Sequence, residues 1–386
     1  MLENLSRIQR IGLEGRLDEQ ETYWADQRRL DTWLQLHREC EAKYEQVYGR
    51  RRTMPKADWK GLFKADPTDW LLAEGAPWVR YRTLVDLLDR PLDDPEVTAA
   101  RQAMQEHPAM QELVAEAAGW PGYPLKRHND AKHPLHKLAI LADFGLQADD
   151  PGMDKVIAAV MAHQSTEGAF QTLTQVPKAY GGSGQAAWTW MLCDAPTILY
   201  ALLSFGLREH EAMQRAIEHV ISFIRDNGWP CAVSPDLGKF RGPGRKADPC
   251  PYVNLIVLKA LAQVPELQDS PAAHTGAEML LGHWERQAGR KIYMFGIGTD
   301  FRKLKYPFIW YDILHVTDVL SGFPFARQDP RLREMAEVIL SKQDDRGCFT
   351  PQSVWRASKG WEFGQKKAPS PWITLLALRM IKRLSV

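Results

Sequence analysis

The sequence contains no uninterrupted apolar run of about twenty residues, so it predicts no membrane-spanning helix. Its N-terminus also lacks an apolar stretch of signal-peptide length. The chain has only five cysteines, at positions 40, 193, 231, 250 and 348, and this odd, scattered set does not match a disulfide framework. We therefore expect a cytoplasmic protein whose thiols are reduced.

An excess of charge of one sign is also missing. The 386 residues include 49 Lys and Arg against 48 Asp and Glu, a formal net charge of +1. A nucleic-acid binder that works through a broad basic field would carry a clear excess, so we expect no nucleic-acid partner. The Gly-Gly-Ser-Gly run at 181–184 is not followed by Lys-Ser or Lys-Thr, which excludes a nucleotide-binding P-loop there.

What the sequence does contain is an internal repeat. Six segments are apolar on most faces, as in helices buried on both sides, and their starts lie 55 to 61 residues apart. The segments start at Trp78, His133, Asp194, Pro251, Tyr311 and Ser370. More charged, amphipathic segments follow most of them, at 93–107, 149–164, 208–226 and 329–344. Three of these four begin with Asp before Pro, which predicts an acidic N-cap and a proline in the first turn.

These alternating segments predict an all-α fold, an (α/α)6 toroid of helical hairpin repeats with inner and outer helices. We expect residues 67–386 to form the toroid and residues 1–66 to form a charged helical N-terminal arm. A helix at about 18–48 would complete the outer ring. An open solenoid of the same hairpins is the alternative. Strand signals are nearly absent.

Reactive side chains occur just before two of the expected inner helices, where the loops of a toroid converge on one mouth. Asp248 and Cys250 precede the fourth inner helix, and His315 lies one turn into the fifth. A carboxylate, a thiolate and an imidazole suit Zn²⁺, and three protein ligands leave the open position of a catalytic site. The spacing alone is unspecific, and a buried cysteine with a hydrogen-bonded core histidine is the alternative.

Two further groups are weaker candidates. Cys193 and Asp194 open the third inner helix and would face the same mouth, although burial in the core is the simpler interpretation. His128, His133 and His136 precede or begin the second inner helix, and the last two share one helical face. Such spacing is compatible with contacts to a metal or a phosphate.

The segment KFRGPGRKADPCPY, which carries Asp248 and Cys250, resembles the zinc-ligand segment of protein prenyltransferase β subunits. HVTDVLSG at 315–322 is similar to the segment that holds the zinc histidine of that family. AYGGSGQAAWTWMLCDAPTILYAL is similar to its Gly-rich loop and the helix that follows. Gly-aromatic turns, at Gly168, Gly228 and Gly347, resemble the repeat shared with squalene cyclases. The resemblance covers about 67–386.

The resemblance implies a zinc-dependent transferase in which Asp248, Cys250 and His315 bind Zn²⁺ and act in catalysis. The metal would activate a small-molecule or peptide thiol, or water, for attack on a prenyl diphosphate, with Mg²⁺ accompanying the diphosphate. The residues expected around the substrate are Arg241, Arg245, Lys246, Tyr252, Lys303, Lys305 and Tyr311. A basic loop that is simply solvated is the alternative for the cations. The family also implies a partner similar to its α subunit, which nothing in this chain resembles.

Two other functions remain open at this stage. A carbohydrate-active (α/α)6 barrel would need two carboxylates across the cavity, for which Asp194, Asp312 and Asp318 are available. A non-catalytic toroid would bind a hydrophobic ligand or a partner protein. The acidic motif Asp-x-Asp-Asp of the cyclases is missing, as is the Asp-rich magnesium motif of terpene synthases.

Overall fold

The computed structural model describes residues 59–385, except for 239, 241, 243, 288, 290, 291 and 293. Within these residues the secondary structure is helical apart from one two-stranded sheet, so the predicted all-α class is confirmed. No helix in this part of the chain combines the length and the apolar character needed to cross a membrane. The predicted helix at 18–48 lies outside the described residues.

Each of the six repeated apolar segments forms a helix. They are α4 (Pro77–Arg82) with a π-helical turn (Thr83–Leu87), α7 (Pro134–Phe144), α9 (Ala195–Ser204), α11 (Pro251–Leu261), α13 (Ile313–Ser321) and α15 (Pro371–Leu384). Each helix packs against the next in this order, and α15 also packs against α4. All side chains of α11 and α13 are buried, which explains why these segments are apolar on most faces.

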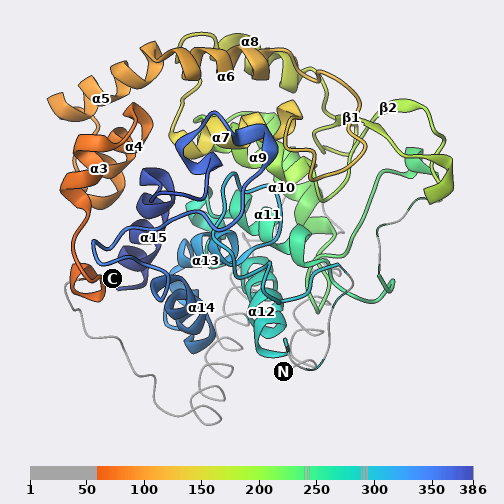
Figure 1. Cartoon of the computed structure of the whole chain (residues 1–386). Coiled ribbons are helices and arrows are strands. Elements are labelled where there is room, and N and C mark those ends of the chain that lie inside the picture. The colour runs from red at the N-terminus through yellow and green to blue at the C-terminus, as the bar shows by residue number, and fades with distance from the viewer. Residues whose placement is uncertain are drawn as a thin grey trace. The chain divides into compact units, whose positions relative to one another are not determined.

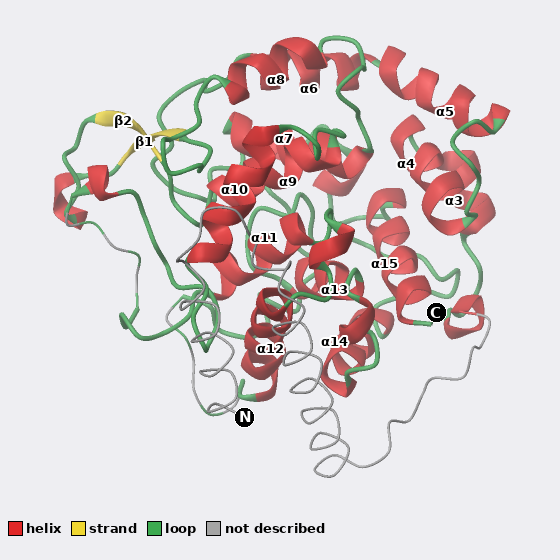
Figure 2. Cartoon of the chain, turned by 180° about the vertical axis from the view of Figure 1, so that it is seen from behind, coloured by secondary structure: helices red, strands yellow, loops and turns green. Residues whose placement is uncertain are grey.

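The amphipathic segments form helices on the outside of this group (Figures 1 and 2). They are α5 (Pro95–Glu106), α6 (Pro108–Ala118), α8 (Met153–Met161), α10 (Glu211–Ser222), α12 (Pro271–Glu285) and α14 (Pro330–Leu340), and a short α3 (Thr68–Glu74) precedes α4. Helix α10 packs on α9, α12 on α11 and α14 on α13. Within the described residues, the four predicted amphipathic segments therefore form α5, α8, α10 and α14, between the apolar helices.

Two of the three expected acidic caps are present. The Asp94 carboxylate accepts a hydrogen bond from the N–H of Glu96 at 2.8 Å, and the Asp329 carboxylate accepts one from the N–H of Arg331 at 2.8 Å. The cap predicted for α8 is wrong, because that helix begins after Gly152. Asp150 instead accepts hydrogen bonds from the side chains of α5.

Glycines with positive φ precede three aromatic residues at the repeated turns. Gly168, Gly228 and Gly347 have φ of 95°, 106° and 73°, a region open to glycine at little cost. The turns at Gly168 and Gly347 are each closed by an isolated antiparallel bridge from a glutamine to a phenylalanine, Gln164 to Phe170 and Gln343 to Phe349. At Trp229 and Phe349 the turn is hydrogen-bonded to the residue that caps the next inner helix, Cys250 and Ser370 respectively.

A β-hairpin between α8 and α9 departs from the expectation of almost no strand. β1 (Thr172–Gln175) pairs antiparallel with β2 (Ala186–Thr189), with Thr172 opposite Thr189. Along β1, buried residues alternate with half-buried ones, the pattern of a strand with one covered face. The hairpin loop contains the Gly-rich run at 181–184.

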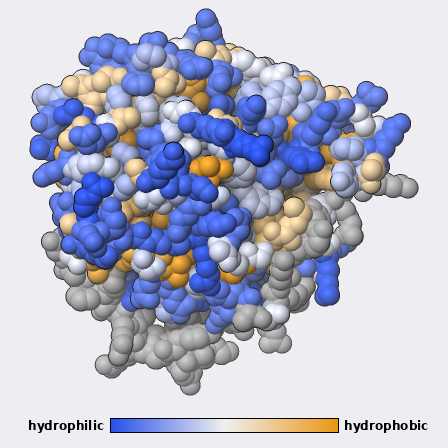
Figure 3. Space-filling view, viewed as in Figure 1, coloured by the Kyte–Doolittle hydropathy of each residue, from blue (hydrophilic) through white to orange (hydrophobic). Residues whose placement is uncertain are grey.

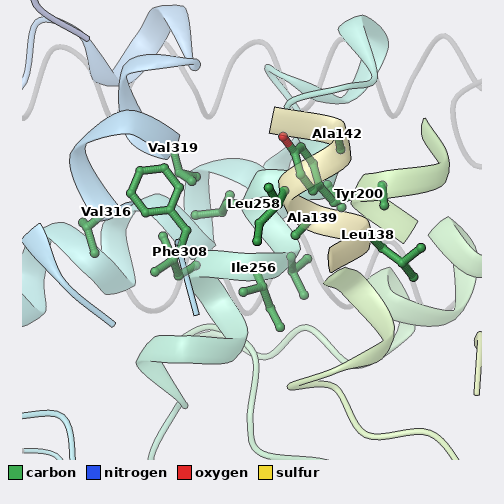
Figure 4. Packing of buried hydrophobic residues seen from close by; sticks show 14 of the residues in the cluster. Leu138, Ala139, Ala142, Tyr200, Ile256, Leu258, Phe308, Val316 and Val319 are labelled. Atoms are coloured by element: carbon green, nitrogen blue, oxygen red, sulfur yellow. The ribbon is translucent and has the colours of Figure 1, made fainter. Parts of the chain in front are cut away.

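The interior between the inner helices is apolar but contains buried ionic groups, one of them around Asp143. Figure 4 shows side chains of α7, α9, α11 and α13 packed together with Phe308. At one end of α7, the Asp143 carboxylate accepts hydrogen bonds from Lys259 at 2.8 Å, Tyr200 at 2.5 Å and Tyr306 at 2.9 Å. This carboxylate therefore ties together α7, α9, α11 and the segment before α13.

The outer surface is mostly polar. The face seen in Figure 3 is largely hydrophilic, and its apolar side chains form small separate groups. Of the predicted N-terminal arm at 1–66, only the last residues are described. Among them the N–H of Lys64 donates to Gln343 at 2.7 Å, so this short piece packs on the turn after α14. The domain boundary at residue 66 stays a prediction.

Candidate metal centre

Three potential metal ligands meet where α7 and α9 begin. His128 lies in the loop before α7, and Cys193 and Asp194 lie directly before α9. The Nδ1 of His128 is 2.9 Å from an Asp194 carboxylate oxygen, and its Nε2 is 3.2 Å from the Cys193 sulfur. Among the described residues, this is the one group of three His, Cys, Asp or Glu side chains whose candidate ligand atoms all lie within 4.8 Å of one another.

The position of His128 is fixed by two other histidines. His136, in the first turn of α7, has its Nε2 at 2.7 Å from the carbonyl oxygen of His128. His133 caps the same helix, because its Nδ1 accepts from the N–H of Leu135 at 3.1 Å, and its Nε2 contacts the Tyr123 carbonyl at 2.9 Å. Burial lowers the pKa of His136 to about 4, so its neutral ring donates through Nε2. Both histidines therefore hold the loop in place.

Burial and the charge of Asp194 both shift pKa values in this group. They act in opposite directions on His128 and in the same direction on Cys193. Burial disfavours the imidazolium of His128, but the adjacent Asp194 carboxylate outweighs it and raises the histidine pKa. Burial raises the pKa of the Cys193 thiol, and the nearby Asp194 charge adds to the shift. Asp194 is 1% exposed, and its second carboxylate oxygen is buried without a hydrogen-bond partner. A buried oxygen without a donor is costly, and a cation would satisfy it.

Two more thiols lie beside the group. Cys231 belongs to the segment after α10, and Cys250 is the N-cap of α11. The Cys250 thiol donates a hydrogen bond to Cys231, and the charge of His128 acts on the same sulfur. Hydrogen bonding from Cys250, opposed by burial and assisted by His128, lowers the pKa of Cys231 to about 7. The site therefore contains three sulfur atoms, one imidazole and one carboxylate.

The predicted ligands Asp248, Cys250 and His315 do not form such a group in this structure. Cys250 lies at the edge of the centre, next to Cys231, whereas His315 is turned away into the interior. Its ring is 1% exposed and stacks on Phe308 with a centroid distance of 4.5 Å. Burial lowers its pKa to about 3, and the charge of Lys259 acts in the same direction. The structure therefore does not bring His315 together with Asp248 and Cys250, and its role as a metal ligand stays a prediction.

The residues predicted to surround a substrate fall into three groups. Arg245 and Lys246 are exposed in the loop before α11, and Arg241 lies outside the described residues. Lys303 pairs with Asp300 at 3.2 Å, and Lys305 is buried against the ring of Trp355. The aromatic pair is also buried. Tyr252 stacks on Trp310 at 5.2 Å, and Tyr311 contacts His283 at 3.0 Å.

A pocket of about 60 Å³ lies against the centre, between the loop before α7 and the β-hairpin. The pocket is lined by both basic and apolar side chains, and His128 and Asp194 are among its lining residues. The other lining residues are Leu125, Lys126, Arg127, Thr174, Val176, Pro177, Tyr180, Met191 and Phe240. A larger surface groove of about 400 Å³ also contacts Lys126 and Pro177 and includes Lys178. The centre is thus next to a positively charged depression.

Sequence reasoning had noted Cys193, Asp194 and the three histidines but placed the metal elsewhere. The informative signal is position along the chain. The histidines lie at the start of α7, and Cys193 and Asp194 lie directly before α9, just as Asp248 and Cys250 lie directly before α11. Cys231 carried no such signal, because it lies about twenty residues before α11.

Comparisons with known proteins add little to this geometry. No protein-family model and no curated protein matches the chain. One solved structure, of a protein from Actinoplanes, is similar over 80% of this chain and 90% of its own, with 16% identity and a TM-score of 0.39. That similarity is too low to carry an argument about fold or function.

Proposed function

We propose that this chain is a zinc-dependent transferase of the prenyltransferase-like class, built as an α/α toroid with its metal at the mouth. The toroid is inferred from the order of helix contacts, in which α4 neighbours both α7 and α15, so that the six inner helices form a closed series. An open array of hairpins would have no contact between its first and last repeats.

One observation supports a metal ion at this place. The candidate ligand atoms of His128, Cys193 and Asp194 all lie within 4.8 Å of one another. An imidazole nitrogen, a thiolate sulfur and a carboxylate oxygen are donors that suit zinc. The buried, unpartnered oxygen of Asp194 also fits a cation. Three protein ligands leave one position open, and the adjacent pocket gives a small reactant a route to it.

The side chains at the centre have separate roles in this proposal. Asp194 accepts the hydrogen bond from Nδ1 of His128, which orients the ring, and the Cys193 sulfur lies 3.3 Å from Nδ1 and 3.2 Å from Nε2 of that ring. His136 holds the carbonyl of His128 and so fixes the loop. When bound, zinc would lower the pKa of an acceptor thiol or of water, so that a nucleophile exists at neutral pH.

The pocket supports an anionic reactant with an apolar part. Lys126 and Arg127 would stabilise the charge that gathers on a leaving diphosphate, with or without Mg²⁺. Met191 and Phe240 would contact the adjoining carbon atoms. The volume of about 60 Å³ is far below the roughly 300–1,000 Å³ of a typical ligand site, so it would take only the reacting end.

No specific observation favours the carbohydrate-active alternative. It needs two free carboxylates, but Asp318 is bound by Arg379 at 2.9 Å and Asp194 by His128. Asp312 caps α13, where its carboxylate accepts from the N–H of His315 at 3.0 Å. The partner similar to an α subunit and the acceptor thiol both stay predictions.

Elemental analysis of the full-length chain tests the metal. We expect about one zinc per chain, loss of that zinc in His128→Ala and Cys193→Ser, and retention in Cys348→Ser. Cys348 is a matched control, because it is also a buried free cysteine but its thiol contacts only the carbonyl of Arg346. Zinc at background level in the wild-type protein would overturn the proposal.

A variant at the originally predicted ligand separates the two ligand sets. His315→Gln should keep its zinc if the metal lies at His128, whereas loss of zinc there with retention in Cys193→Ser would restore the sequence-based set. Circular dichroism would establish that each variant is folded. Substrate class is then tested by thermal shift with prenyl diphosphates, because a ligand that binds only the folded state raises its melting temperature.

A further inference from the structure

The segment that carries Cys231 is fixed to the start of α11. The carbonyl oxygen of Trp229 accepts hydrogen bonds from the N–H of Cys250 at 2.8 Å and from the Asn254 amide at 2.9 Å. The N–H of Trp229 in turn donates to Asn254 at 3.0 Å. Trp229 is itself fully buried, and its indole N–H donates to the Val220 carbonyl at 2.7 Å. Two residues before Cys231, the chain is therefore anchored beside Cys250.

The same segment is fixed on its other side. The N–H of Leu192 donates to the Ala232 carbonyl at 2.9 Å, and the N–H of Ser234 donates to the Trp190 carbonyl at 2.8 Å. These two bonds form a short antiparallel bridge next to Cys231. Because the backbone is held both before and after it, the Cys231 side chain has little freedom to move away from Cys250.

The two thiols are in direct contact. The Cys250 S–H donates to the Cys231 sulfur, which also accepts a hydrogen bond from the N–H of Gly242. Gly242 lies so close that a Cβ on it would be 1.9 Å from that sulfur, so only glycine fits there. Both cysteines are half-buried. Cys193 differs, because it is buried and its sulfur contacts His128 and Met191.

We propose that Cys231 and Cys250 form a redox-active dithiol, a modification site that a hydroperoxide converts into an intramolecular disulfide. This inference does not depend on the proposed transferase or on its metal. It rests on two sulfur atoms in hydrogen-bond contact and on the backbone bonds that hold them there.

The reaction balances in two steps. The Cys231 sulfur attacks one peroxide oxygen, the O–O bond breaks, and water leaves as Cys231 becomes a sulfenic acid. The Cys250 sulfur then attacks the Cys231 sulfur, the S–S bond forms, the S–O bond breaks, and a second water leaves with the Cys250 proton. Two electrons pass from the thiol pair to one molecule of hydrogen peroxide, and reduction by a dithiol reverses the change.

The disulfide would alter the neighbouring centre. It replaces the Cys231 thiol near His128 by a disulfide sulfur. It also ties the loop through Gly242 to the N-terminal end of α11, because Gly242 packs on the same sulfur. Oxidation is thus expected to act on the site next to the pocket and to leave the remote Cys348 unaffected.

Peptide mapping of the full-length wild-type chain tests the proposal without any variant. Trypsin places every cysteine in a different peptide, with Cys231 in 226–239 and Cys250 in 247–259. The reduced protein is treated with one equivalent of hydrogen peroxide, alkylated and digested without reductant. The expected result is a linked pair of these two peptides, lighter by about 2 Da than their sum, that disappears after treatment with dithiothreitol.

Other products would overturn the proposal. These are a disulfide that joins Cys193 to either thiol, an intermolecular disulfide, sulfinic acid on Cys231 without a linked peptide, or no modification. In Cys250→Ser we expect the linked pair to vanish, whereas Cys348→Ser should form it as the wild type does. Repeating the experiment after chelator treatment separates this result from the metal proposal, because the same disulfide should form whether or not zinc was present.

Discussion

Replacing Lys259 by methionine should destabilise the fold strongly, because it leaves the Asp143 carboxylate buried without its counter-ion. Lys259 and Asp143 are 8% and 6% exposed, and their nitrogen and oxygen atoms are 2.8 Å apart. Breaking a buried pair by removing one partner costs about 3–5 kcal/mol. Tyr200 and Tyr306 would still donate to the carboxylate, so we expect the lower half of that range. Methionine keeps most of the packing against the Tyr200 ring, which lies 4.2 Å from the lysine nitrogen.

Urea denaturation followed by circular dichroism gives the free energy of unfolding for this variant. The double variant Asp143→Asn with Lys259→Met should cost clearly less than the sum of the two single changes, because neither then leaves a buried charge. Lys64→Met is the control, since Lys64 pairs with Asp345 on the exposed surface and should cost less than about 1 kcal/mol. A loss below about 1 kcal/mol in Lys259→Met, or additive single effects, would refute this account of the core.

Two further predictions concern backbone and pH. Gly228→Ala should lower the free energy of unfolding by about 1–3 kcal/mol, because φ is 106° and a Cβ would lie 2.5 Å from the Asn254 amide oxygen. Gly61→Ala, where a Cβ meets no atom within 4 Å, should have almost no effect in the same urea titration, and equal effects would contradict the argument. Burial raises the pKa of Asp312 to about 7, above its unfolded value, so the stability should fall as the pH rises from about 4 to 7. Asp312→Asn should flatten that fall, and an unchanged pH profile of the unfolding free energy would count against it.

The inner helices were predictable because burial on both sides leaves a strong pattern in the sequence. The residues of α11 and α13 are all buried, and both segments are apolar on most faces. The acidic caps were predictable for similar local reasons at Asp94 and Asp329. At α8 the same Asp-Pro pattern did not predict the start of the helix, because Asp150 is used by Arg101 and Gln105 of a different helix. Contacts between distant segments of this kind leave no local pattern.

The candidate metal ligands were only partly predictable for a related reason. Position directly before an inner helix places a residue at the start of that helix, as it does for Cys193, Asp194 and Cys250. Position along the chain does not fix the direction of a side chain. His315 lies one turn into α13, and its ring stacks on Phe308 in the interior. The hairpin of β1 and β2 was missed because each strand has only four residues.

The contact between the first and last inner helices has a consequence for synthesis of the protein. Arg379 of α15 reaches back to Asp86, 293 residues earlier, at 3.2 Å, and it also binds Asp318 of α13. During synthesis, the ion pair between Asp86 and Arg379 cannot form until 293 further residues have been translated. The earlier hairpins must therefore form while the flank of α4 that α15 covers is still open, and removal of the last two turns of α15, which include Arg379, would remove this contact.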